Sequence, residues 1–222
     1  MRVAALYDVH GNLPALEAVL AEVDAAGVDA IVCGGDVAAG PFPVECLELL
    51  RAREAVFIRG NADRELSPWL LEQLSPAERG FLAELPHVGS LDGVLYCHGS
   101  PRSDDEILTR VSPDERFRAA LAAVEAKLVV GGHTHVQFER DVDGARFVNA
   151  GSVGMPYEGR PGAFWALVSD ELVELRRTPY ALDAAVAAIR ATGYPGTDDL
   201  CSTLLDPESP DEASAYFESL VS

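Results

Sequence analysis

Seven side chains that are able to bind metal ions follow short apolar runs of the 222-residue sequence. They comprise four imidazoles, two carboxylates and one amide: His10, His98, His133, His135, Asp8, Asp36 and Asn61. A buried cluster of this kind would leave charges and polar atoms unpaired without a cation, whereas two divalent ions would satisfy them. Nitrogen and oxygen donors without a thiolate favour Mn, Fe, Zn, Co or Ni over Ca or Mg. The residue types therefore indicate a dinuclear metal centre whose open positions admit water and a substrate.

The apolar runs that precede these residues have the length and the boundaries of buried strands. They cover residues 2–7, 29–33, 55–58, 94–97 and 127–130. Each run ends at a polar or glycine-rich turn. Because the carboxyl ends of parallel strands meet at one crevice of an α/β sheet, we expect five strands to bring the seven side chains together. Cys97 directly precedes His98, so its sulfur is expected to point to the opposite face, into the core.

Helical segments alternate with the first strands, which favours βαβ units. Asn12 is suited to cap one helix, and Ser75 and Ser112, each followed by proline, are suited to begin two others in a capping box. After Gly132 the pattern changes to short strands, expected at residues 136–141, 146–149, 163–168 and 172–176. Short turns join them, as in an antiparallel sheet. The sequence therefore predicts a mixed α/β domain.

The C-terminal part of the chain is typical of an acidic helical segment. From Tyr180 onward the pattern is helical with proline interruptions, and no lysine or arginine follows Arg190. We predict a main domain over residues 1–178 and a helical appendage over residues 179–222 that packs on it. A solvated appendage at one edge is the favoured interpretation; a lid or a contact with a second copy is the alternative.

The composition argues against several classes of protein. Seventeen basic and 36 acidic residues give a net charge of −19, which disfavours stable nucleic-acid binding. No run approaches the length of an apolar membrane span, and the N-terminus has no apolar signal core, so neither membrane association nor secretion is expected. The four cysteines form no Cys-X-X-Cys pair, which favours reduced thiols and a cytoplasmic location. The sequence leaves a homo-oligomer open.

Five blocks of the sequence, taken in order, resemble the signature of the calcineurin-like metallophosphoesterases. The blocks are Asp8-Val9-His10-Gly11-Asn12, Gly35-Asp36, Gly60-Asn61, His98-Gly99 and Gly132-His133-Thr134-His135. The run at residues 149–152 is similar to the Asn-Pro-Gly-Ser loop of that family. The small size of the chain is similar to the prokaryotic phosphodiesterase branch.

The resemblance implies a four-layer α/β/β/α sandwich, with two mixed sheets flanked by helices and a metallophosphoesterase domain over residues 1–178. It would place one metal on Asp8, His10, Asp36 and His135, and the second on Asp36, Asn61, His98 and His133. Manganese is the most expected metal. The implied reaction is hydrolysis of a phosphodiester or phosphoanhydride by a hydroxide that bridges two ions about 3.5–4 Å apart. Asp36, His10 and Asn61 would then be catalytic.

The third block departs from the pattern of the family at one position. Much of the family has Gly-Asn-His-Asp/Glu there, and this sequence has Gly60-Asn61-Ala62-Asp63. The usual histidine assists the leaving group or binds the phosphate, and Ala62 can do neither. The departure therefore favours substrates with good leaving groups over alkyl monoesters.

Three further residues are candidates for contact with a small phosphorylated substrate, such as a nucleotide. Arg59 and Arg64 flank the third block and either bind phosphate or form surface ion pairs. Asn12 is either a substrate contact, at a helix end that faces the phosphate, or only a helix cap. His87 matches no motif and is expected in a loop.

Two alternative functions remain open. A phosphomonoesterase, including protein phosphatases, or a dinucleoside polyphosphate hydrolase would share the metal centre, but these enzymes usually keep the histidine that Ala62 replaces. A non-catalytic scaffold similar to the retromer subunit would have lost metal-centre residues, and all seven are present here. Hydrolysis of phosphodiesters is the favoured interpretation.

Overall fold

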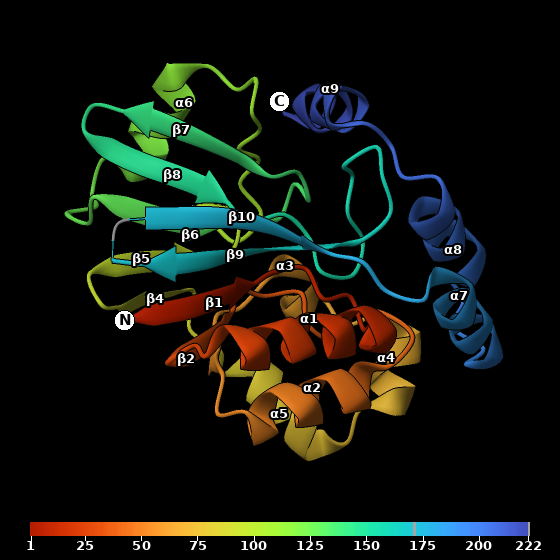
Figure 1. Ribbon diagram of the computed structural model, residues 1–222. Coiled ribbons are helices and arrows are strands. Elements are labelled where there is room, and N and C mark those ends of the chain that lie inside the picture. The colour runs from red at the N-terminus through yellow and green to blue at the C-terminus, as the bar shows by residue number, and fades with distance from the viewer. Residues whose placement is uncertain (171, 222) are drawn as a thin grey trace.

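The first of two sheets is built around the N-terminal strand. The computed structural model describes residues 1–170 and 172–221. The strands of this sheet are β1 (Arg2–Leu6), β2 (Ala30–Cys33), β3 (Val56–Phe57), β9 (Ala163–Ser169) and β10 (Leu172–Thr178). Their order is β10-β9-β1-β2-β3 (Figure 1). Because β1, β2 and β3 are parallel, their carboxyl ends lie at the same edge.

The second sheet has three parallel strands at its centre and one antiparallel strand at each edge. Its strands are β4 (Val88–Leu91), β5 (Val94–Cys97), β6 (Leu128–Gly131), β7 (Phe138–Val142) and β8 (Ala145–Asn149). Their order is β4-β5-β6-β8-β7. Strands β5, β6 and β8 are parallel, whereas β4 and β7 pair antiparallel at the two edges. The five strands predicted before the metal-binding residues are all present, within one residue at each end.

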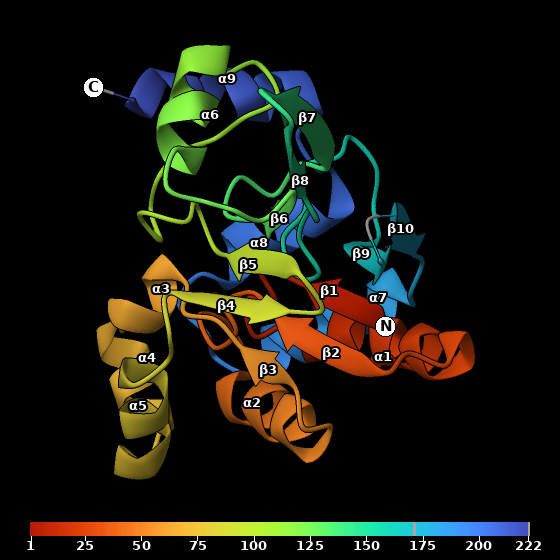
Figure 2. The same ribbon diagram turned by 90° about the vertical axis from the view of Figure 1, so that its left-hand side faces the viewer.

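Helices cover the outer faces of both sheets. The described helices are α1 (Leu13–Ala26), α2 (Pro43–Ala52), α3 (Asn61–Arg64), α4 (Pro68–Gln73), α5 (Pro76–Ala83), α6 (Asp114–Leu121), α7 (Leu182–Ala191), α8 (Thr197–Leu205) and α9 (Pro210–Leu220). Helices α1 and α2 lie beside the first sheet and α6 beside the second (Figures 1 and 2). Helices α7, α8 and α9 follow one side of the molecule (Figure 1). In the described part of the chain, no helix is both long and apolar enough to cross a membrane.

Three buried apolar clusters fill the spaces between the four layers of the structure. One joins the first sheet to α1 and α2 and includes Leu6, Leu16 and Leu47. The second lies between the sheets and includes Tyr7 and Val130. The third joins the second sheet to α6, and its members include Cys97, Val129, Phe147 and Phe117. The α/β/β/α sandwich is therefore confirmed, and Cys97 lies in the core as expected.

The prediction that residues 136–176 form consecutive strands of one antiparallel sheet is wrong. The chain makes two hairpins instead: β7 and β8 belong to the second sheet, and β9 and β10 to the first. The reason lies in β9, which is almost entirely buried. Its Trp165 faces the helix layer and its Ala166 faces the other sheet, so β9 requires cover on both sides.

Two of the three predicted helix caps are confirmed and one is wrong. The Asn12 side chain accepts a hydrogen bond from the Ala15 N–H (3.3 Å), and Ser75 forms the capping box with Glu78. Helix α6, however, begins at Asp114 without a side-chain cap. The Ser112 hydroxyl is engaged elsewhere, because it accepts from the Thr109 N–H (2.9 Å) and donates to Glu218 in α9.

Candidate metal centre

All seven predicted ligands follow strand ends at one edge of the two sheets. Asp8 and His10 follow β1, Asp36 follows β2, and Asn61 begins α3 after β3. The second sheet adds the remaining three after β5 and β6: His98, His133 and His135. Parallel strands in each sheet deliver their carboxyl ends to this edge, as expected from the sequence.

The ligand atoms form two overlapping groups. Asp8, His10 and His135 form one group and Asp8, Asp36 and His98 the other, with candidate ligand atoms within 4.8 Å of one another in each. The His135 Nε2 lies 3.2 Å from Asp8 Oδ1 and 3.1 Å from His10 Nε2. The His98 Nε2 lies 3.6 Å from Asp8 Oδ1 and 3.4 Å from Asp36 Oδ2. Asp8 thus faces both groups, and Asp36 Oδ2 also lies 3.9 Å from His10 Nε2.

The donor atoms at the centre of this cluster fit divalent cations. Three of them are buried and have no hydrogen-bond partner within the described residues: Asp8 Oδ1, Asn61 Oδ1 and His98 Nε2. Buried polar atoms are normally hydrogen-bonded, so unpaired ones require an explanation. Two carboxylates with several imidazoles and an amide form a donor set typical of transition-metal sites.

Backbone carbonyls orient three of the imidazoles. The Nδ1 atoms of His10, His98 and His135 lie 3.3, 2.8 and 2.6 Å from the carbonyl oxygens of Ala39, Gly34 and Met155. An Nδ1–H that donates to a carbonyl leaves the Nε2 lone pair free, which is the arrangement found around metal-bound histidines. The three rings are therefore held with Nε2 directed at the cluster before any ion binds.

Backbone N–H groups orient the two carboxylates. Asp36 Oδ1 accepts from the Ala62 N–H (2.8 Å), and Asp8 Oδ2 accepts from the His133 N–H (2.9 Å). Each carboxylate therefore keeps one oxygen for a cation. A Cβ at Gly132 would lie 2.5 Å from Asp8 Oδ2, so only glycine permits this close approach.

Five of the seven ligands have left-handed backbone conformations. The φ angles are 52°, 45°, 52°, 68° and 57° for Asp8, His10, Asp36, His133 and His135. Residues other than glycine rarely adopt this region, and strain of this kind concentrates at functional sites. All five residues lie within four residues of the end of a parallel strand.

The charges of the cluster are strongly coupled. Burial alone would lower the pKa of His98, but the carboxylates of Asp36 and Asp8 raise it to about 10. Burial and the nearby His98 lower the pKa of His133 to about 4. Burial would raise the pKa of Asp36, yet the charge of His98 holds it below its usual range. A cation at His98 Nε2 must displace a proton, so metal affinity is expected to rise with pH.

Asp63 connects two turns of the candidate site, and the sequence analysis did not identify this role. Its buried carboxylate accepts from the backbone N–H groups of Asp36 (2.7 Å), Val37 (3.0 Å) and Gly60 (3.0 Å). It therefore joins the turns after β2 and β3. The available signal was its place after Ala62, where the family motif has Asp or Glu.

Asp63→Ala is expected to lower the free energy of unfolding by about 3 kcal/mol, because three buried N–H groups would lose their acceptor. Chemical denaturation would measure the change, with Glu72→Ala in exposed α4 as the control. A loss as small as that of the control would contradict this role of Asp63.

The three predicted substrate contacts have protein partners. Arg59 Nε donates to Asp104 (2.9 Å), and an Arg64 guanidinium nitrogen lies 3.3 Å from the same carboxylate. Both arginines therefore form ion pairs with Asp104, whose carboxylate is nearly buried. Asn12 is buried, caps α1, and donates from its amide to the Gly154 carbonyl (2.9 Å). Contact of these three residues with a substrate stays a prediction.

Helices α8 and α9 lie beside the candidate metal centre. A cavity of about 240 Å³ is lined by His10 on one side and by Asp199 and Thr203 of α8 on the other. The Phe217 ring of α9 lies 6.1 Å from the His133 ring. Arg116 of α6 donates to Glu218 (2.9 Å) and so connects α9 to α6. The sequence predicted that the C-terminal helical segment packs at one edge of the molecule. It did not predict that this edge adjoins the candidate metal ligands.

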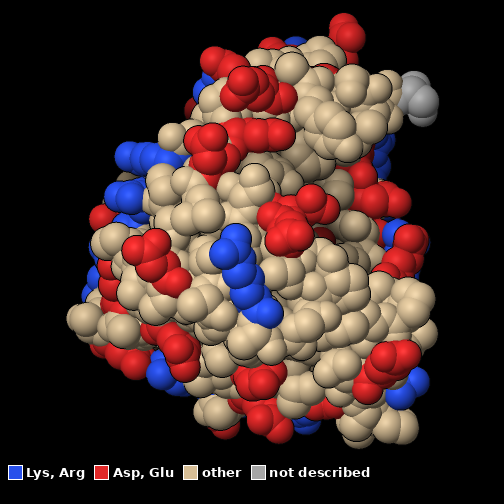
Figure 3. Space-filling view, turned by 90° about the vertical axis from the view of Figure 1, so that its right-hand side faces the viewer, with Lys and Arg blue, Asp and Glu red and all other residues tan. Residues whose placement is uncertain are grey.

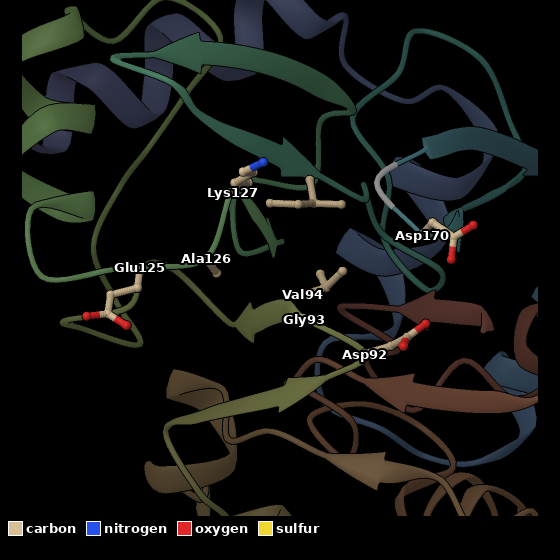
Figure 4. Close-up of a pocket in the computed structure, with 8 residues that line it drawn as sticks. Asp92, Gly93, Val94, Glu125, Ala126, Lys127 and Asp170 are labelled. Atoms are coloured by element: carbon tan, nitrogen blue, oxygen red, sulfur yellow. The ribbon is translucent and has the colours of Figure 1, made fainter.

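A second hollow, of about 380 Å³, lies at the opposite end of the sheets (Figure 4). Its lining includes Asp92 and Gly93 in the β4–β5 turn, Lys127 before β6 and Asp170 after β9. These are the amino ends of the parallel strands β5 and β6, whereas His98 and His133 follow their carboxyl ends. This hollow is therefore remote from the candidate metal centre.

The fold contains two stacked sheets with a cluster of candidate metal ligands at one edge. Comparison with known proteins gives the family of the chain. Residues 1–171 match the model of the calcineurin-like phosphoesterase superfamily domain. The chain belongs to this superfamily. It is a metallophosphoesterase, a hydrolase that acts on phosphoester bonds.

Individual relatives agree with this assignment. The solved metallophosphoesterase of Sphaerobacter thermophilus is 30% identical with a TM-score of 0.79, over 93% of this chain and 99% of that one. Phosphodiesterase YfcE of Escherichia coli is 26% identical over 84% of this chain and 98% of its own length. The hypothetical protein PH1004 of Pyrococcus horikoshii, 21% identical with a TM-score of 0.81 over 94% of this chain and 99% of that one, shares the fold.

Proposed function

We propose that this protein hydrolyses phosphodiesters with the help of two divalent metal ions, of which manganese is the first candidate. The observation that carries the proposal is the set of buried donor atoms on Asp8, Asn61 and His98 that have no hydrogen-bond partner within the described residues. Two of these residues, Asp8 and His98, belong to the two groups of candidate ligand atoms, which also include His10, Asp36 and His135. The similarity to Phosphodiesterase YfcE supports the class of substrate. A cytoplasmic location stays a prediction, supported by four buried free cysteines.

Asp8, His10, Asp36 and His135 would hold one ion, and Asp36, Asn61, His98 and His133 the other. Two such ions, when bound, lower the pKa of water and offset the charge of the phosphoryl oxygens. The protein fixes the positions of the ligands beforehand, through the three carbonyls behind the imidazoles and the N–H groups behind the carboxylates. Such preorganisation reduces the cost of reorganising the site during the reaction.

The third block of the sequence, at residues 60–63, favours substrates with good leaving groups. Ala62 offers only its backbone N–H, and this group donates to Asp36 Oδ1. No side chain at this position can protonate the departing oxygen. A leaving group that is stable as an anion, such as p-nitrophenolate, does not need that proton.

The protein loaded with Mn²⁺ is expected to hydrolyse bis(p-nitrophenyl) phosphate with a kcat/KM at least about tenfold above that for p-nitrophenyl phosphate, in line with the similarity to Phosphodiesterase YfcE. Both esters release p-nitrophenolate, so the comparison does not depend on a proton donor. Release of p-nitrophenolate measures both reactions. A preference for the monoester would support a phosphomonoesterase instead. No turnover of either ester by metal-loaded protein would support a non-catalytic scaffold.

A further inference from the structure

The cavity between the metal centre and α8 is positioned to receive one ester group of a substrate. His10 and Tyr157 line it on the side of the metal ligands, and Tyr194, Asp199 and Thr203 line it on the other side. Its volume of about 240 Å³ is below the range of about 300–1,000 Å³ typical of sites for drug-sized ligands. The cavity therefore suits a compact group.

Two tyrosines give the cavity an aromatic lining that is held in place. The Tyr157 ring stacks on the His135 ring at 5.1 Å and 16°. The Tyr194 ring packs edge-on against Trp69 of α4 at 5.1 Å and 71°. Aromatic rings attract cations through their negative faces, and quaternary ammonium groups are bound in this way.

Among the charged side chains, only a carboxylate lines the described part of the cavity. Asp199 is the carboxylate of the described lining, which contains no lysine or arginine. Burial, and after it the field of Asp199, raises the pKa of Tyr194. Acidic side chains are also more prominent than basic ones on this face of the molecule (Figure 3).

We propose that this cavity selects phosphodiesters in which one ester group is compact and cationic, such as a trimethylammonium-ethyl ester. Asp199 and the two tyrosines attract the cation, whereas a further phosphate in this cavity would meet the Asp199 carboxylate and no lysine or arginine of the described lining. The proposal rests on the phosphodiesterase activity proposed above, and it disfavours dinucleoside polyphosphates as substrates.

Two chromogenic diesters of equal size test the proposal. One is p-nitrophenyl phosphocholine, and the other is p-nitrophenyl 3,3-dimethylbutyl phosphate, its neutral isostere. In both, water adds its oxygen to phosphorus, the bond from phosphorus to the p-nitrophenolate oxygen breaks, and a proton passes to the solvent. With the protein loaded with Mn²⁺, we expect kcat/KM to be about tenfold higher for the cationic ester.

Two neighbouring aspartates provide matched variants. Asp199→Asn is expected to lower the ratio of the two kcat/KM values about fivefold, because the cavity loses its carboxylate. Asp198→Asn removes the same charge from an exposed residue of α8 outside the described cavity lining, and the ratio is expected to stay within about twofold of wild type. A wild-type ratio near one, or equal effects of both variants, would overturn the proposal.

Direct binding separates failure of the cavity from failure of the activity. Calorimetry with choline and with 3,3-dimethylbutanol measures the same preference without turnover, and choline is expected to bind about tenfold more tightly. Tight choline binding by a protein that hydrolyses neither diester would overturn the proposed function alone. Turnover of bis(p-nitrophenyl) phosphate without preference for the cation in either assay would overturn the cavity proposal alone.

Discussion

Asp36→Asn is expected to lower kcat/KM for bis(p-nitrophenyl) phosphate by at least about a thousandfold. Asp36 Oδ2 lies 3.4 Å from His98 Nε2 and 3.9 Å from His10 Nε2, so it faces ligands of both proposed ions. Asparagine has nearly the same shape and can still accept from the Ala62 N–H, but it carries no charge to hold two cations. Loss of about 4 kcal/mol of transition-state stabilisation corresponds to roughly a thousandfold in rate.

Steady-state kinetics at saturating Mn²⁺ would measure this loss. Asp198→Asn, at an exposed position of α8, is the control for the loss of one negative charge. Circular dichroism would establish that both variants are folded. Turnover of Asp36→Asn near that of wild type would contradict a mechanism that depends on both ions.

His98→Ala is expected to reduce the bound metal from two ions to about one per chain and to lower kcat/KM by about a hundredfold or more. The His98 side chain is fully buried, and its unpaired Nε2 lies within 3.6 Å of both carboxylates. Removal of the imidazole leaves the second ion with three of its four proposed ligands, and leaves two buried carboxylates without their cationic neighbour.

His87→Ala is the matched control for this substitution. His87 is half-buried and its Nε2 also lacks a hydrogen-bond partner within the described residues, but it lies outside the candidate metal centre. Metal content by elemental analysis after gel filtration would compare the two variants. Two tightly bound ions in His98→Ala would contradict the assignment of this residue as a ligand.

The positions of the candidate metal ligands were predictable because topology determines them. Each follows an apolar run that is too short for a helix, and parallel strands place their carboxyl ends at one edge. Once β1 and β2 are parallel, Asp8 and Asp36 must be neighbours. The prediction required only correct strand assignments and did not require side-chain packing.

Features that depend on contacts across the fold were not predictable in the same way. Glu218 approaches Ser112 from 106 residues away, and this contact removes the predicted cap of α6. The chain also passes from the second sheet to the first before β9. This crossing depends on β9 being buried between the helix layer and the second sheet. The position of α8 beside His10 likewise follows from tertiary packing, which leaves no periodic signal in the sequence.

The central claim, that the seven residues hold a pair of cations, is tested most directly by anomalous diffraction from crystals of the protein grown with Mn²⁺. Two peaks about 3.5–4 Å apart are expected, one beside His10 and His135 and the other beside His98 and Asn61. A single peak, or none at this edge of the sheets with manganese bound elsewhere, would contradict the account.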